Sequence, residues 1–160
     1  MKQNRLSEIQ TLITGRVSTI RSGTKKRIEE ILRDYPKMDR YIRDRREELM
    51  FPTKSEDDNV GGGKSSKISK PQEQMIITID EDKELKALER EKKAVFDVLC
   101  DSDTDTNIIA RELYFKEHPT YTINGLSDDH IIYCGHTQAF QKKAKLIRNI
   151  AKEIGLYDPY

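Results

Sequence analysis

The last third of the chain carries an apolar stripe at helical spacing, and this pattern limits the fold more than any other feature. The stripe consists of Phe140, Ala144, Ile147, Ala151 and Ile154. Residues that recur every three or four positions share one face of a helix, here about four turns long, whereas a strand needs a period of two. Gly155 is a natural residue to end such a helix. The stripe predicts a long amphipathic helix packed against other helices.

Earlier segments repeat the helical spacing, and glycine or proline separates them. The supporting positions are Leu6, Ile9 and Ile13; Ile28, Ile31, Leu32 and Tyr35; Met38, Tyr41, Ile42 and Leu49; and Ile109, Ala110 and Leu113. Gly15, Pro36, Pro52 and Pro119 follow these four groups, at places where a helix is expected to end. The predicted fold class is all-α, with a helical N-terminal and central unit followed by a C-terminal helix-turn-helix.

The central segment shows a short heptad pattern. Leu85, Leu88, Val95 and Leu99 fall on a and d positions, and Lys92 is in register between them. Two heptads are too short for an independent coiled coil, so this helix is expected to pack on the N-terminal helices or on a second subunit, as in a homodimer. The preceding residues MIITI either begin the helix or form a short strand, and periodicity does not decide between the two.

These patterns divide the chain into four parts. They are N-terminal helices in 1–50, a connector in 51–74 that contains glycine and serine, a central helix in 75–100, and a helix-turn-helix module in 101–160. Charged residues make up 36% of the chain and hydrophobic residues 35%, and tryptophan is absent. This apolar supply predicts a thin core and elongated helical parts.

The connector contains the run DNVGGGKSS, which resembles a phosphate-binding loop in its chemistry but not in its spacing. Its motif residues are Gly61, Gly62, Gly63, Lys64 and Ser65. A P-loop requires a glycine at the position that Asp58 occupies, and it joins a buried strand to a helix. Pro71 argues against a helix directly after the run. The sequence therefore predicts a turn or linker, no nucleotide cofactor and no enzymatic activity.

Two segments contain side chains that can bind metal ions. In DSDTDTNIIARE, the four acids Asp101, Asp103, Asp105 and Glu112 have calcium-loop spacing, but Thr106 stands where that loop requires glycine. We expect Asp103 or Asp105 to cap the next helix instead.

A zinc site is not expected either, because His130, Cys134 and His136 lack the paired short spacings of structural zinc sites. Cys134 is expected to be a small buried residue in a turn. Cys100 and Cys134 are expected to be reduced thiols in a cytoplasmic protein. No signal peptide and no membrane span are expected, because no long apolar run occurs.

Charge is distributed unevenly along the chain. Between residues 80 and 105, ten acids face five bases, which makes this segment a candidate contact for a basic protein surface. Between residues 138 and 152 there are five bases and no acid. A basic helix of this kind is typical of nucleic-acid binding.

The order of elements around the basic helix suggests a helix-turn-helix. A helix ends near Pro119, Thr122 is a natural N-cap for a short helix, and Cys134 and Gly135 lie in a turn before the basic helix. The candidate DNA-binding residues are His136, Thr137, Gln138, Gln141, Lys142, Lys143, Lys145 and Arg148. The polar residues at the start of the helix would read bases, and the cations would contact phosphates. Phe140 is expected to belong to the core.

The segment from Arg45 to Pro71 resembles the RinA/ArpU-type transcriptional regulators, small activators of late genes in temperate phages of Gram-positive bacteria. Those proteins carry Arg-Glu-Glu, an aromatic-Pro step, an acidic-Asn segment, a triple glycine with a basic residue and Ser, and then Pro. The matching residues are Arg46, Glu47, Glu48, Phe51, Pro52, Asp57, Asp58, Asn59, Gly61, Gly62, Gly63, Lys64, Ser65 and Pro71. The segments LYFKEHPTYTINGLSDDH and KKAKLIRNIAKEIGL are similar to the family's C-terminal module, which is itself similar to region 4 of sigma factors.

This resemblance implies a phage-encoded activator that binds double-stranded DNA at a late promoter and recruits host RNA polymerase in the bacterial cytoplasm. The alternative is a helical assembly or DNA-packaging protein, similar to a small terminase subunit, that binds DNA with little sequence specificity. A discrete binding site favours the activator, and a ring-like oligomer favours the packaging protein.

Overall fold

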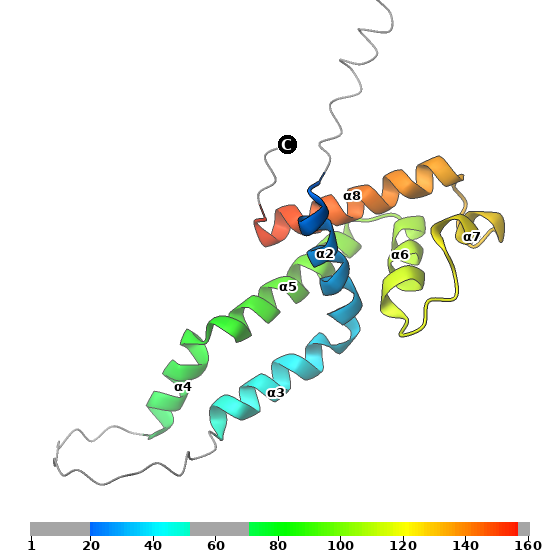
Figure 1. The fold of residues 1–160 in the computed structure, drawn as a ribbon. Coiled ribbons are helices and arrows are strands. Elements are labelled where there is room, and N and C mark those ends of the chain that lie inside the picture. Colours follow the sequence, from blue (N-terminus) through cyan, green and yellow to red (C-terminus); the bar gives the residue numbers. More distant parts are fainter. Residues whose placement is uncertain (1–19, 52–70, 157–160) are drawn as a thin grey trace, which may run out of the picture.

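The computed structural model describes residues 20–51 and 71–156, and every element in these two ranges is helical (Figure 1). The elements are α2 (Ser22–Asp34), the 3-10 turn η1 (Tyr35–Lys37), α3 (Met38–Met50), α4 (Pro71–Glu81), α5 (Lys83–Cys100), α6 (Thr104–Ala110), the π-helical turn η2 (Arg111–Phe115), α7 (Ile123–Asp128) and α8 (His136–Ile154). The predicted all-α class is confirmed. The helix predicted around Leu6 and the motif from Gly61 to Ser65 lie outside the described residues.

Helices α3, α4 and α5 form an arm that extends from the rest of the molecule. Helix α3 runs outward and α4 and α5 return beside it in the opposite direction (Figure 1). We call residues 38–50 and 71–93 the arm. Ion pairs join its two sides, as between Arg46 and Glu89 at 2.5 Å and between Lys92 and Asp39. Lys92, the polar residue in the heptad pattern, is thus paired with an acid of α3.

The predicted central helix is two helices, because Asp82 begins a new one. Its carboxylate accepts a hydrogen bond from the Leu85 backbone N–H at 2.6 Å, which caps α5, and one from Arg45 at 2.7 Å. The hydrogen bond from Arg45, with that from Leu85, lowers the pKa of Asp82. The residues MIITI lie in α4.

The expectation that Pro71 would prevent an immediate helix is wrong. Helix α4 begins at Pro71, inside the range 51–74 assigned to the connector. Proline suits the first helical position, because its fixed φ matches the helix and the N–H that it lacks would be unpaired there anyway.

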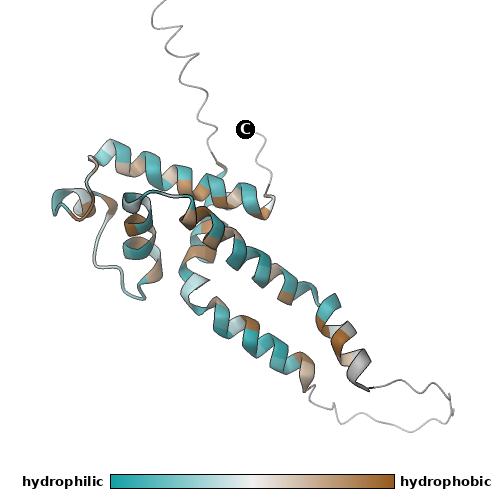
Figure 2. Ribbon diagram, turned by 180° about the vertical axis from the view of Figure 1, so that it is seen from behind, coloured by the Kyte–Doolittle hydropathy of each residue, from teal (hydrophilic) through white to brown (hydrophobic). Residues whose placement is uncertain are grey.

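The main core lies where α2, α5, η2 and α8 meet (Figure 2). Its buried residues are Ile28, Ile31, Leu32, Met38, Ala94, Val95, Val98, Ala110, Tyr114, Leu146, Ile147, Ile150, Ala151 and Ile154. A second, smaller cluster joins α6, α7 and the start of α8. It contains Ile109, Leu126, Ile132, Cys134 and Ala139. Cys134 is buried in the turn, as predicted from the sequence.

The buried face of α8 differs from the predicted stripe in its first half. Phe140 is 51% exposed and Ala144 is also exposed, whereas Ala139 is fully buried. The prediction that Phe140 belongs to the core is therefore wrong. The first half of α8 packs on α6 and α7, and the second half packs on α5 and α2. The buried residues Ala139, Leu146, Ile150 and Ile154 recur at spacings of seven and four, so the buried face is one stripe, turned away from Phe140 and Ala144.

None of the helices in the described ranges is both long enough and apolar enough to cross a lipid bilayer.

Candidate nucleic-acid interface

Helix α7, the following turn and α8 form a unit held by the second core cluster. The Thr122 side chain accepts a hydrogen bond from the Gly125 N–H at 3.2 Å, which caps α7 as predicted. Leu126, which is fully buried, packs in that cluster with Ile132 and Ala139. The buried Leu126 side chain thus anchors α7 beside the start of α8.

Hydrogen bonds fix the turn between α7 and α8. The Leu126 carbonyl accepts from the N–H groups of Ile131 and Ile132 at 3.0 and 3.1 Å. The Ser127 hydroxyl donates to the Cys134 carbonyl at 2.8 Å. His130 adopts a φ of 54°, in the left-handed region that non-glycine residues seldom occupy. The turn is irregular but has a defined path.

The first turn of α8 presents polar side chains to solvent. Thr137, Gln138 and Gln141 are exposed, as base-contacting residues must be. His136 also lies on the surface, where its Nε2 is 2.7 Å from a carboxylate oxygen of Asp128. This pair places the Asp128 carboxylate beside the start of α8, so His136 already has an intramolecular partner.

Lys142 is turned toward the protein. It forms ion pairs with Asp103, the N-cap of α6, and with Asp105 at 3.3 Å. The hydrogen bond from Lys142, with those from Thr106, lowers the pKa of Asp103 to about 2. In turn, the hydrogen bond to Asp103 raises the pKa of Lys142. The predicted capping by Asp103 is confirmed, and the lysine that was expected to contact phosphate holds α8 against α6.

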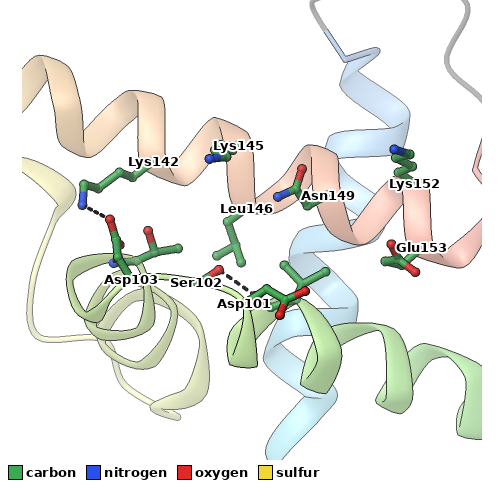
Figure 3. A pocket seen from close by; sticks show the side chains of 11 residues that line it. Asp101, Ser102, Asp103, Lys142, Lys145, Leu146, Asn149, Lys152 and Glu153 are labelled. Carbon is green, nitrogen blue, oxygen red and sulfur yellow. Dashed lines mark hydrogen bonds and ion pairs between the residues drawn. The ribbon is translucent and has the colours of Figure 1, made fainter.

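The same side of α8 lines a groove of about 440 Å³ above the junction of α5 and α6 (Figure 3). Lys142 reaches across one end of it to Asp103, and Leu146 points toward its floor. Asp101, Asp103 and Glu153 supply carboxylates to this groove. Lys145 and Lys152 also line this groove, so cations and carboxylates share it.

Lys143 is also engaged inside the protein. Its Nζ lies 3.4 Å from a carboxylate oxygen of Glu29 on α2 and 5.4 Å from the centre of the Tyr114 ring. The Tyr114 hydroxyl donates to Glu29 at 2.9 Å. Burial, together with the nearby Glu29 carboxylate, raises the pKa of Tyr114, so its hydroxyl stays protonated and remains a donor. Lys143 therefore joins α8 to α2 and η2.

The remaining cations follow the polar residues along one outer side of α8. Spacings of three and four residues place Thr137, Gln141, Lys145, Arg148 and Lys152 on this side, which we call the outer stripe. Lys145 and Lys152 are exposed, and neither forms an ion pair with any residue that the structure describes; Arg148 is half-buried. The stripe faces away from the main core and is the surface of α8 on which a polyanion can lie.

Residues 24–150 match a family model described as "Protein of unknown function (DUF722)". The chain belongs to this family. No curated protein and no solved structure matches the chain. The match to DUF722 runs from α2 into the second half of α8, so it contains the second core cluster, all of the main core except Ala151 and Ile154, and most of the outer stripe.

In this DUF722 chain, most acids of segment 80–105 form ion pairs with cations of the same chain. Six of the ten are paired with cations of the same chain: Asp82, Glu84, Glu89, Glu91, Asp103 and Asp105. The partners of these acids are far away in the sequence, and the acidic contact surface stays a prediction.

The structure thus separates the predicted DNA-binding residues of the DUF722 chain into two groups. Thr137, Gln138, Gln141 and Lys145 are exposed, whereas His136, Lys142 and Lys143 have acidic partners. Arg148, which is half-buried, falls in neither group. Lys152 was not among the predicted residues. Its spacing of seven residues from Lys145 was the signal that could have identified it.

No group of three or more His, Cys, Asp or Glu side chains that could hold a metal ion is found among the residues described. His130, Cys134 and His136 therefore do not come together. Instead, burial and a hydrogen bond to Asp105 raise the pKa of the Cys134 thiol, which acts as part of the core.

Proposed function

We propose that this chain is a sequence-specific DNA-binding activator of phage late genes, which recruits host RNA polymerase in the bacterial cytoplasm. The outer stripe of α8 is the observation that carries the proposal. Polar side chains lie at the N-terminal end of the stripe, and Lys145 and Lys152 follow without acidic partners in the described ranges.

The order of the stripe suits a recognition helix. In helix-turn-helix proteins the N-terminal residues of the second helix reach base edges, while cations around it contact phosphates. Gln141 can form two hydrogen bonds with adenine, and Thr137 can contact a thymine methyl group or a base edge. Helices α7 and α8 and the hydrogen-bonded turn between them supply the corresponding scaffold.

The resemblance to RinA/ArpU-type regulators supports the choice of an activator. The matching residues from Arg46 to Pro71 and the segment similar to sigma-factor region 4 both favour this class. The cytoplasm of the bacterial host is the compartment where such a protein meets both phage DNA and polymerase.

A salt titration of two lysine variants tests the proposal. The probe is a duplex selected from a random-sequence library by the wild-type protein, compared with a random duplex of equal length. Lys145→Ala removes one phosphate contact, so the slope of log K against log salt should flatten by about one unit on both duplexes. Lys142→Ala removes the same charge from the same helix but from its inner side, and it should leave the slope close to that of the wild type.

A base-reading variant completes the test. Gln141→Ala should cost about 1–3 kcal/mol on the selected duplex and little on the random one. If Lys145→Ala keeps the wild-type slope and Gln141→Ala binds both duplexes like the wild type, α8 does not read DNA. Sequence-tolerant binding by a ring-like oligomer would then favour the assembly or packaging protein.

A further inference from the structure

The outer face of α5 carries four cations in one line. Lys83, Lys86, Arg90 and Lys93 recur at spacings of three and four residues, which places them on one side of the helix. All four are exposed. We call them the α5 basic stripe, and at 1.5 Å per residue they extend over about 15 Å.

Three of the four acids of α5 do not neutralise this stripe, because they pair with cations of the neighbouring helices; the fourth, the half-buried Asp97, lies four residues after Lys93 and ends the stripe on the same side. The pairs are Glu84 with Arg45 at 3.1 Å, Glu89 with Arg46 at 2.5 Å, and Glu91 with Arg27 at 2.6 Å. Within the ranges that the structure describes, the four cations of the α5 basic stripe form no ion pair. The outer side of the helix is therefore basic up to Lys93, and the first three acids serve contacts with α2 and α3.

An exposed aromatic residue adjoins the α5 basic stripe. Phe96 is 55% exposed, one helical turn after Lys93. Both residues line a groove of about 470 Å³ between α3 and α5, with Ile42 as a further apolar wall. Aromatic side chains beside cations are typical of protein–protein contacts, whereas a surface that only contacts phosphates has no need of an apolar groove.

The position of the arm separates this surface from the outer stripe of α8. Helix α5 packs against the side of α8 that carries Leu146, Ile150 and Ile154. The outer stripe begins on the far side of α8 at Thr137, and its Lys145 and Lys152 line the groove that borders this contact. The arm then extends away from α8 (Figure 1). One straight duplex along the outer stripe therefore does not run along the α5 basic stripe.

We propose that the outer face of α5 docks an acidic segment of a partner protein. Lys83, Lys86, Arg90 and Lys93 pair with its carboxylates, and an apolar side chain of the partner enters the groove at Phe96. The choice of host RNA polymerase as this partner rests on the proposed function. The stripe supplies charge complementarity, and Phe96 supplies the apolar anchor that fixes the position of the contact.

The test measures binding of the full chain to purified host RNA polymerase and, separately, to the selected duplex. Phe96→Ala and the double variant Lys86→Ala/Arg90→Ala should each weaken polymerase binding by about tenfold. Both should bind the duplex with the wild-type affinity and salt slope. The matched control is Arg40→Ala/Arg43→Ala, which removes two exposed cations of the same arm that lie near Asp44 on α3. The control should bind polymerase like the wild type.

Three outcomes would overturn the inference, and the first two can be told apart from failure of the proposed function. If both α5 variants bind polymerase like the wild type, the docking proposal is wrong and the proposed function is unaffected. A flatter salt slope on the duplex for Lys86→Ala/Arg90→Ala assigns the stripe to nucleic acid instead. If the wild-type protein does not bind polymerase, both the partner and the recruitment step fail. By contrast, failure of DNA recognition would appear only in the Lys145 and Gln141 variants.

Discussion

Replacing Ile150 by alanine tests where the core of α8 lies. The Ile150 side chain is fully buried between α8, α2 and α5. Alanine removes three carbon atoms, and at about 0.8 kcal/mol for each buried methylene this loss is about 2.4 kcal/mol. The cavity left behind adds to it, which gives an expected loss of about 3–4 kcal/mol in the free energy of unfolding.

Phe140→Ala is the matched comparison on the same helix. Phe140 is 51% exposed, so much of its ring is in water in the folded protein. We expect its replacement to cost about 1 kcal/mol or less, in the range of surface substitutions and shallow contacts. Ile150→Val, which removes a single methyl group from the core, should cost about 0.5–1.5 kcal/mol.

Urea unfolding followed by circular dichroism measures the three variants. Linear extrapolation gives the free energy in water, and the slope against urea should stay near that of the wild type. Equal losses for Phe140→Ala and Ile150→Ala would contradict the packing described for α8. In that case, the stripe that the sequence suggested would be the buried face.

Three further predictions concern contacts that join the helices. The folded-state pKa of Asp103, about 2, lies below its ordinary value, so its contribution to stability is present above about pH 4 and is lost as the pH falls toward 2. In acid unfolding, Lys142→Ala should therefore lose less free energy of unfolding than the wild type between about pH 4 and pH 2. Tyr114→Phe, which removes the hydroxyl that donates to Glu29, should lower the free energy of unfolding by about 0.5–1.5 kcal/mol in a urea titration, and more if Glu29 is left without another donor. Thr122→Ala should cost about 0.5–2 kcal/mol by loss of the cap of α7, whereas Thr122→Ser should retain most of the stability.

The helices could be predicted from the sequence where one apolar face meets one neighbour. Ile28, Ile31 and Leu32 have helical spacing, and all three are buried. The same reasoning failed at Phe140, because Ala139, Leu146 and Ile150 continue the helical spacing on an adjacent face, and that face is the one that the other helices cover. Periodicity indicates that a residue lies on an apolar face, but it does not indicate whether another helix covers that point.

The candidate site could be located from the sequence but not resolved into its working residues. The basic run predicted a nucleic-acid-binding helix at α8, and Thr137, Gln141 and Lys145 are exposed there. Lys142 and Lys143 were indistinguishable from Lys145 in the sequence. Their acidic partners come from α6 and α2, and only the tertiary fold brings these groups together.

The arm has a consequence for how the molecule opens. Beyond the main core, its described side chains contribute two buried apolar residues, Ile42 and Leu85. Ion pairs also join its two sides, of which Arg45–Asp82 is partly buried and Arg46–Glu89 is exposed. Exposed ion pairs add little stability and weaken as salt is added. The backbone amides of the arm should therefore exchange with solvent through local opening, at a free energy below that of global unfolding, while the amides around Ile150 exchange only when the whole protein unfolds. Binding of a partner along α5 would then slow exchange in the arm far more than in the core.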